Sequence, residues 1–228
     1  EELAIAGYDC VINYLTSEKE AYALNEKIKQ YKIRSLVIKC DVSNENEVDA
    51  MFNLIEKELG GVDILINNAA IDLPNIFERK TASDFRKVLD VNVIGAYNTA
   101  KRAAKHMLKQ KWGRIINISS TNSMNTYFSM CLEYDASKAA LNSLTHNLAI
   151  QFAPYINVNA IAPGFINTEN EVLGYDEEFM EMELSKILKR RMGEAKEVAK
   201  LVKFLISDDA DYINNTIIRI DGGQYSSY

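Results

Sequence analysis

The sequence lacks any run of eighteen apolar residues and has no secretory signal pattern, which argues against a membrane-spanning or conventionally secreted protein. Cysteine is scarce: Cys10, Cys40 and Cys131 are odd in number and not spaced as metal ligands. Cys10 and Cys40 lie in apolar, strand-like runs, so we expect both to be small buried side chains. This cysteine usage fits a reducing, cytoplasmic setting.

An excess of basic residues is also absent. The chain has 26 Lys and Arg against 32 Asp and Glu, a net charge of −6. This balance argues against a nucleic-acid-binding surface, and Lys189–Arg191 is too short a basic run to change that expectation. No linker, repeat or low-complexity segment interrupts the 228 residues, of which 47% are apolar. We therefore expect one domain over 1–228.

Glycine is nearly absent from the first quarter, where Gly7 is the only one before Gly60. Glu1–Gly7 resembles the end of a helix capped by Gly7. Dinucleotide-binding doubly wound domains open with a strand and a glycine-rich turn before that helix, so roughly twenty residues are lacking by this comparison. The absent strand would lie between the runs at 10–13 and 62–66. Its absence would leave buried backbone groups without partners, so we expect either that the domain is N-terminally truncated or that these two runs rearrange to pair.

Elsewhere, short β-branched runs alternate with longer amphipathic stretches. The predicted strands are Cys10–Asn13, Leu36–Lys39, Val62–Ile66, Arg114–Ile118, Ile156–Ile161 and Ile217–Ile220. The predicted helices are Ser17–Tyr31, Glu45–Leu59, Thr81–Lys109, Glu133–Phe152 and Glu194–Ile206, with Asn44 and Thr81 as N-caps. This alternation predicts an α/β fold: a doubly wound, Rossmann-like three-layer sandwich with a mainly parallel sheet, lacking its first strand and glycine-rich loop.

Tyr134 and Lys138 are the most informative pair. Four residues apart on a helix, they share a face, and an ammonium beside a phenol favours the phenolate, which suits a general acid–base in alcohol/ketone chemistry. Tyr97 and Lys101 have the same spacing. Only Tyr134 follows a strand that ends in hydroxyls, Ser119 and Ser120, so the context favours the Tyr134 pair.

Other small polar signals also follow predicted strands: Asp41-Val42, Asn67–Ala70 and Pro163-Gly164. In such sheets ligands bind beyond the carboxyl ends of the strands. Together with Asn92, Ser120, Tyr134, Lys138 and Asp221–Gly223, these motifs make the whole chain resemble the classical short-chain dehydrogenase/reductase family. No metal is implied by this resemblance.

The resemblance implies roles for individual residues. Tyr134 would be the proton donor in carbonyl reduction, and Lys138 would lower the pKa of Tyr134 and bind the nicotinamide ribose. Ser120 would hold the substrate oxygen, and Asn92 would position a water. The expected cofactor contacts are Asn13, Asp41 and Val42 at the adenosine end, Asn68 and Ala69 near the ribose, and Pro163, Gly164, Ile166 and Thr168 with Tyr134 and Lys138 at the nicotinamide end.

The sequence departs from the family pattern in four places. The glycine-rich loop is absent, which removes the pyrophosphate cradle. Ala70 stands where glycine is usual, and Asp135 follows Tyr134 where small apolar residues are common. The Ser120-to-Tyr134 gap is one residue longer than usual, so we expect the 121–133 loop to be rebuilt.

Cofactor choice depends on the end of the second strand of such a fold, where an acidic residue would bind the ribose 2′-hydroxyl and repel a 2′-phosphate. Here Asn13–Ser17 carries no acid before Glu18, which favours NADP(H) over NAD(H).

The resemblance favours 3-oxoacyl-acyl-carrier-protein reductases of fatty-acid synthesis, with sugar, polyol or hydroxysteroid dehydrogenases as alternatives. An acidic carrier protein would meet basic residues such as Lys101, Arg102 and Lys105, although charge runs usually mark a solvated helix face.

Substrate choice would come from 121–133 and 168–191, where Phe179, Met180 and Leu184 form the apolar face of a lid helix or of an ordinarily packed one. Family members usually form homotetramers through their long helices. A catalytically silent Rossmann-like binding module is the alternative of another class.

Overall fold

The computed structural model describes residues 1–124, 126–168 and 176–225. The strands are β1 (Cys10–Tyr14), β2 (Ser35–Lys39), β3 (Ile64–Asn67), β4 (Gly113–Ile118), β5 (Ile156–Pro163), β6 (Ile166–Asn167), β7 (Gly193–Glu194) and β8 (Ile217–Ile220). The helices are α1 (Glu2–Ile5), α2 (Glu18–Ile28), α3 (Glu45–Leu59), α4 (Ala82–Leu89), α5 (Gly95–Gln110), α6 (Leu132–Phe152), α8 (Glu177–Ser185) and α9 (Ala195–Leu205). All six predicted strands and four of the five predicted helices are present as single elements, and the helix predicted at 81–109 is divided. The ends of Glu45–Leu59 and Ile217–Ile220 are as predicted, and those of the other elements are shifted.

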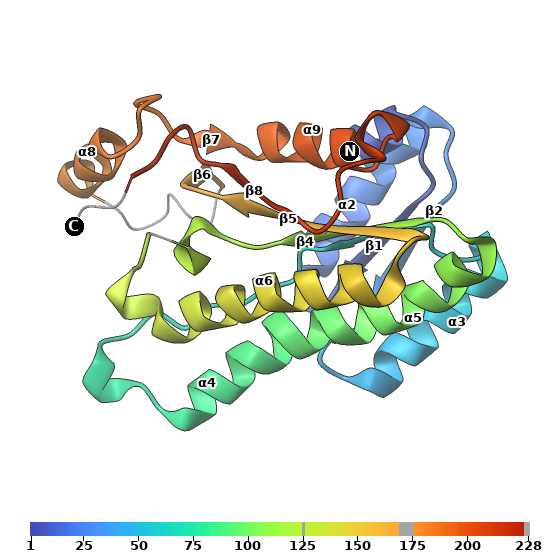
Figure 1. The fold of residues 1–228 in the computed structure, drawn as a ribbon, viewed down its shortest axis with the longest axis horizontal. Helices are drawn as coiled ribbons and strands as arrows, with labels where there is room; N and C mark the ends of the chain where they lie inside the picture. The colour runs from blue at the N-terminus through green and yellow to red at the C-terminus, as the bar shows by residue number, and fades with distance from the viewer. Residues whose placement is uncertain (125, 169–175, 226–228) are drawn as a thin grey trace.

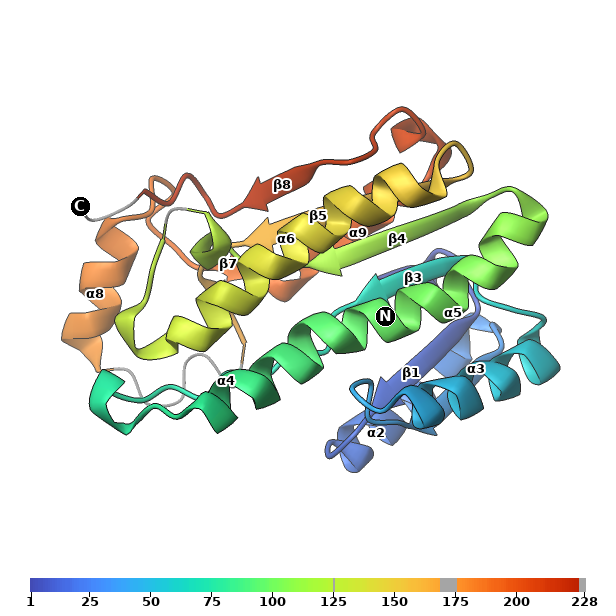
Figure 2. The same cartoon turned by 60° about the horizontal axis from the view of Figure 1, so that its bottom comes forward.

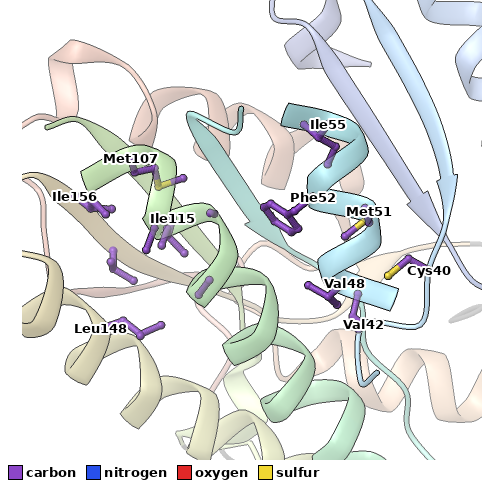
Figure 3. Close-up of a cluster of buried hydrophobic side chains, with 14 of the residues drawn as sticks. Cys40, Val42, Val48, Met51, Phe52, Ile55, Met107, Ile115, Leu148 and Ile156 are labelled. Carbon is purple, nitrogen blue, oxygen red and sulfur yellow. The ribbon is translucent and has the colours of Figure 1, made fainter. Parts of the chain in front are cut away.

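Helices cover both faces of a parallel sheet, which confirms the predicted Rossmann-like architecture (Figure 1). On one side, α3, α5 and α6 enclose the larger core, whose labelled side chains include Met51, Phe52 and Ile115 (Figure 3). On the other side, α9 packs on the sheet with α1 beside it, around Ile116, Ile161 and other aliphatic residues. The central strands β4 and β5 are almost wholly buried because apolar helix faces cover both of their surfaces.

The sheet is divided into two blocks. β1 pairs in parallel with β2, and β3, β4, β5 and β8 form a second parallel block in that order (Figure 2). Among the described strands, β1 and β3 are not hydrogen-bonded to each other. The expected alternative, in which these two strands rearrange to pair, is therefore wrong. The observed order matches the classical doubly wound order with one central position open.

The open position changes the environment of Cys10. We expected this side chain to be buried, but it is only half-buried, whereas Cys40 is buried as expected. Cys10 lies on β1 and lines the groove between β1 and β3, so it lacks a covering neighbour on that side.

The predicted helix 81–109 is interrupted. Thr81 and Asp84 form a reciprocal capping box that starts α4, and the chain then passes through a π-helical turn, Asp90–Ile94, before α5. Periodicity alone did not reveal this turn, which contains Asn92. Such single π turns inside helices are frequent at functional sites.

The first turn of the chain is helical, as predicted. α1 is followed by Gly7, whose φ of +88° is the left-handed conformation in which glycine ends helices. The described helices include none that is both long and apolar enough to cross a bilayer.

Candidate active site

Helix α6 brings Tyr134 and Lys138 together at the carboxyl end of β4. The Lys138 Nζ atom lies 5.4 Å from the centroid of the Tyr134 ring and donates a 2.7 Å hydrogen bond to the carbonyl oxygen of Ile118, the last residue of β4. Lys138 is buried and Tyr134 is half-buried. An ammonium held this close to a phenol favours its anion, which is the arrangement that the spacing predicted.

The second Tyr-x-x-x-Lys pair is a surface feature. Lys101 lies 5.9 Å from the Tyr97 ring, and its Nζ atom donates to a Glu45 carboxylate oxygen at 2.7 Å. Both Tyr97 and Lys101 are exposed on α5. The sequence context therefore separated the two pairs correctly.

The two hydroxyls after β4 have different surroundings. Ser119 is buried, and its Oγ atom donates to the Asn142 side-chain oxygen at 2.6 Å. Ser120 is half-buried and its Oγ atom accepts from the backbone N–H of Asn122 at 3.1 Å. Because the Ser119 hydroxyl is committed to helix α6, Ser120 is the better candidate for contacting a substrate oxygen, as expected from its position.

Asn92 joins three elements from within the π turn. Its side-chain oxygen accepts from the Ile71 N–H at 2.8 Å, and its Nδ2 atom donates to the Ile71 carbonyl at 2.9 Å and to Ser137 Oγ at 2.9 Å. Ser137 in turn donates to the Tyr134 carbonyl at 2.7 Å. The π turn aims this buried amide at α6, so Asn92 supports the Tyr134 backbone. Its expected role in positioning a water stays a prediction.

The segment between Ser120 and Tyr134 folds into two short 3-10 turns, Thr121–Ser123 and Ser129–Cys131, and Asn125 lies outside the described residues. Asp135 holds this segment against α6. Its carboxylate accepts from the Asn122 side chain at 2.8 Å and from the Phe128 N–H at 3.1 Å. Burial raises the pKa of Asp135. Asp135 therefore anchors the segment between Ser120 and Tyr134 to the start of α6.

Burial lowers the pKa of Lys138 to about 8. Because unfolding restores an ordinary lysine pKa, the unfolded chain binds more protons than the folded one between about pH 8 and 10.5. The wild type should therefore gain stability as pH rises through this window, by up to about 1.4 kcal/mol per pH unit.

A Lys138→Met variant lacks this proton linkage. We expect the difference in free energy of unfolding, variant minus wild type, to be largest below pH 8. This difference should become smaller or more negative as pH rises, because only the wild type gains stability. Urea denaturation of both proteins at pH 7.0, 8.5 and 9.5 measures this difference. Parallel pH curves for the two proteins would contradict it.

The predicted cofactor residues lie at the carboxyl ends of the strands. Asn68 and Ala69 are exposed after β3, Pro163 and Gly164 are half-buried at the end of β5, and Ile166 is half-buried in β6 beside the exposed Thr168. A Cβ atom added to Gly164 would approach the Asp221 Cβ atom to 2.6 Å. The close approach of these two loops therefore requires glycine at 164, whether or not a cofactor binds there.

The residues predicted to contact the adenosine end of the cofactor, Asn13, Asp41 and Val42, lie at or just after the ends of β1 and β2. The Asn13 side chain donates to the Cys40 carbonyl at 3.0 Å, and the Asp41 carboxylate accepts from the Ser43 N–H at 2.9 Å. Val42 packs against Gly95, where an added Cβ atom would lie 2.6 Å from its Cγ2 atom. Contacts of these residues with a dinucleotide stay a prediction. Among the nine residues that precede β1 in this sequence, Gly7 is the only glycine.

Two further predictions concern the basic residues of α5, expected to meet a carrier protein, and the apolar residues of α8, expected to form a lid helix or an ordinarily packed one. Lys101 and Arg102 are paired with Glu45 and with Asp49 and Glu56 of α3, respectively, so most of their charge is locally neutralised. In α8, Phe179, Met180 and Leu184 are all half-buried. Residues 169–175 of the 168–191 segment, which was predicted to choose the substrate, lie outside the described residues.

Sequence reasoning missed a buried ion pair next to the site. The Lys80 ammonium binds the Glu133 carboxylate, and both side chains are almost fully buried. Lys80 also donates to the Leu73 carbonyl at 2.7 Å. The pair fastens the segment before α4 to the residue preceding Tyr134. No local signal could reveal it, because its members are 53 positions apart in the sequence.

Comparison with known proteins agrees with this arrangement. The family model described as Enoyl-(Acyl carrier protein) reductase matches residues 1–225. The 3-oxoacyl-[acyl-carrier-protein] reductase FabG of Staphylococcus aureus is 35% identical over 225 residues, covering 98% of this chain and 91% of that protein.

Solved structures give the same result. A gluconate 5-dehydrogenase from Burkholderia cenocepacia, in complex with NADP and tartrate, superposes with a TM-score of 0.89 at 31% identity over 97% of this chain and 87% of that one. An NAD+-bound xylitol dehydrogenase superposes with a TM-score of 0.90 at 26% identity, over 97% and 91% of the two chains. The motifs, the fold and these similarities together show that the chain belongs to the short-chain dehydrogenase/reductase family of NAD(P)-dependent oxidoreductases acting on CH–OH groups.

Proposed function

We propose that this oxidoreductase reduces a ketone with NADP(H), and that its substrate is a 3-oxoacyl thioester carried by an acyl carrier protein. The observation that carries the proposal is the convergence of Ser120, Tyr134 and Lys138 at the carboxyl end of β4, supported from below by Asn92. The similarity to the Staphylococcus aureus reductase supports the thioester substrate.

A nicotinamide held beside Tyr134, Lys138, Pro163 and Gly164 would supply the hydride that the carbonyl carbon needs. Ser120 donates a hydrogen bond to the carbonyl oxygen, and the Tyr134 hydroxyl delivers the proton that this oxygen needs. The Lys138 ammonium stabilises the phenolate that remains. Its anchorage on the Ile118 carbonyl fixes it beneath the ring, so the charge is oriented before the substrate arrives.

A polyol or sugar dehydrogenase is the second candidate within the family. It is supported by the similarity to the gluconate and xylitol dehydrogenase structures. An assay of acetoacetyl thioester reduction against the oxidation of a polyol and sugar-acid panel separates the two. Turnover of polyols without turnover of the thioester would favour the second candidate.

The preference for NADP(H) is also a proposal. It is supported by the absence of an acid directly at the end of β1, where amide and hydroxyl groups can bind a phosphate. Glu18 is the nearest acid, and the Tyr14 hydroxyl donates to its carboxylate at 3.1 Å. This acceptor at the mouth of the adenosine side is the feature that would oppose a 2′-phosphate.

A fluorescence titration of the 228-residue chain with NADPH, and with NADH alongside, tests the cofactor proposal. We expect saturable binding with a dissociation constant on the order of micromolar, tighter for NADPH. Tighter binding of NADH would contradict the preference. Binding that appears only when an N-terminal strand and glycine-rich loop are added would indicate a fragment of an ordinary reductase, and failure even then would favour a catalytically silent binding module.

We further propose a cytoplasmic homotetramer, assembled through the helical faces of α4–α5 and α6. Exposed apolar side chains along this face, including Ile94, Leu108 and Ile150, support an interface there. An acyl carrier protein would be its acidic partner. Nucleic acid and membrane are not proposed as partners, since the net charge is −6.

A further inference from the structure

Helix α6 holds the chain that follows β4 through three polar residues on one of its faces. Asp135, Lys138 and Asn142 are spaced by three and four positions, so their side chains lie one above another along the helix. The Lys138 ammonium binds the last carbonyl of β4, and the other two residues bind the segment after β4, which lies against α6 (Figure 2). Ser120 lies within the chain held in this way.

Asn142 fixes the backbone on both sides of Ser120. Its side-chain oxygen accepts from Ser119 Oγ at 2.6 Å, and its Nδ2 atom donates to Ser123 Oγ at 2.7 Å. The Ser123 hydroxyl in turn donates to the Ser120 carbonyl oxygen. Because Asn142 is buried, water competes little for these contacts. The main chain of Ser120 is therefore held by α6.

The side chain of Ser120 depends on Asp135, at the other end of the same face. Ser120 Oγ accepts from the Asn122 N–H at 3.1 Å. The Asn122 Nδ2 atom donates to one Asp135 carboxylate oxygen at 2.8 Å, and the Phe128 N–H donates to the other at 3.1 Å. Asp135 thus fixes Asn122, and Asn122 fixes the Ser120 oxygen through its backbone N–H.

The directions of these hydrogen bonds suit a serine that donates to a ligand. A hydroxyl oxygen carries one hydrogen and two lone pairs, so accepting from the Asn122 N–H leaves the Ser120 hydrogen available for donation. A carboxylate only accepts, so Asp135 requires the amide nitrogen of Asn122 to face it. The amide oxygen then faces Thr126 Oγ1, which donates to it at 3.3 Å. Asn122 is therefore held in one orientation.

We propose that Asp135 is a positioning residue for Ser120 and acts through Asn122. The inference rests on the proposed function, in which Ser120 donates to the carbonyl oxygen of the substrate. The Asp135 carboxylate keeps Asn122 in the place from which its N–H fixes Ser120 Oγ. The Ser120 hydroxyl is therefore oriented before the substrate arrives, which reduces the reorganisation that the reaction requires.

A purely electrostatic role for Asp135 is the alternative, because its charge follows Tyr134 directly and would disfavour the phenolate. Two substitutions separate the roles. Asp135→Ala removes the charge and both acceptors. Asp135→Asn removes the charge but keeps an oxygen for the Phe128 N–H, and its amide nitrogen can donate to Asn122 once that side chain turns over. Thr126 Oγ1 can then accept from the turned amide, since a hydroxyl both donates and accepts.

Steady-state reduction of an acetoacetyl thioester with NADPH measures the effect on the reaction. Asp135→Ala should lower kcat by about tenfold or more, because a misplaced catalytic group loses much of its effect. The affinity for NADPH should change by less than about twofold. Asp135→Asn should keep kcat within about threefold of the wild type. In a Ser120→Ala background, Asp135→Ala should cause no further loss, because Asp135 acts only through Ser120.

The matched control is Asp84→Ala. The Asp84 carboxylate also accepts from one backbone N–H and one side-chain hydroxyl, both of Thr81, but it lies at the exposed start of α4. Its removal should lower Tm through loss of the capping box and should leave kcat unchanged.

Amide hydrogen exchange, followed by NMR without cofactor or substrate, measures the geometry independently of activity. Exchange at the Asn122 and Phe128 N–H groups should become about tenfold faster or more in Asp135→Ala. It should change little in Asp135→Asn and in Asp84→Ala.

Four kinetic outcomes would overturn the proposal: wild-type kcat in Asp135→Ala, wild-type kcat in Ser120→Ala, equal losses in the two Asp135 variants, or a full further loss in the Ser120→Ala background. Unchanged exchange at Asn122 and Phe128 in Asp135→Ala would overturn it as well. A wild type that reduces no thioester would refute the proposed function instead, and the exchange rates would then decide whether Asp135 fixes Asn122 and Ser120.

Discussion

Tyr134→Phe should lower kcat for reduction of a 3-oxoacyl thioester by about 10²- to 10⁴-fold, the usual contribution of a general acid–base. The substitution removes only the hydroxyl that delivers the proton. The ring, which lies 5.4 Å from the Lys138 Nζ atom, would remain in place. The affinity for NADPH should therefore change little. Steady-state kinetics and a parallel cofactor titration measure the two effects separately.

The matched control is Tyr97→Phe, which removes the hydroxyl from the other tyrosine with a lysine four positions later. That pair lies exposed on α5, so kcat should be unchanged. Full activity of the Tyr134→Phe protein would refute the proposed mechanism. Loss of folding, judged by circular dichroism, would instead assign the hydroxyl a structural role.

Lys80→Met should reduce the free energy of unfolding by about 3–5 kcal/mol, because breaking a buried ion pair leaves one uncompensated charge. Lys80 and Glu133 are 5% and 0% exposed, and the second carboxylate oxygen of Glu133 is buried with no hydrogen-bond partner among the described residues. Little water can therefore solvate Glu133 when Lys80 is removed. Urea denaturation at pH 7 gives the change in stability.

Two further variants test whether the loss of stability in Lys80→Met comes from the unpaired buried charge. Lys101→Met breaks the exposed pair with Glu45, which should change stability by less than about 1 kcal/mol. The double variant Lys80→Met/Glu133→Gln removes both charges, so it should be more stable than Lys80→Met alone. A double variant at least as unstable as the sum of its two single variants would show that the charges do not interact as the structure indicates.

The Lys80–Glu133 ion pair also helps to position Tyr134 in the candidate active site. It fastens the chain between β3 and α4 to the residue before Tyr134, on the side of α6 that also holds Asn92 through Ser137. We infer that the entrance of α6 is held from two directions, by an ionic contact and by a buried amide. This double support fixes the start of α6, and with it Tyr134, independently of the segment that precedes it.

Much of the architecture could be predicted from the sequence, since apolar periodicity and turn residues are local properties. The six longer strands and five helices followed from these patterns, as did the capping residues Asn44 and Thr81, whose side chains both cap helices in the structure. The facing of Tyr134 and Lys138 followed from helical spacing alone. The specific roles of the site residues in catalysis stay predictions.

What only the tertiary structure decided depends on contacts between distant segments. The π turn at Asn92 is stabilised by partners at Ile71 and Ser137, 21 and 45 positions away. The half-buried state of Cys10 reflects a strand position that no described residue fills. The Lys80–Glu133 pair likewise has no local signature. The sequence by itself determined the elements and the motif, because these depend on neighbours along the chain. Burial, charge pairing and the open groove were decided by the fold, because they depend on neighbours in space.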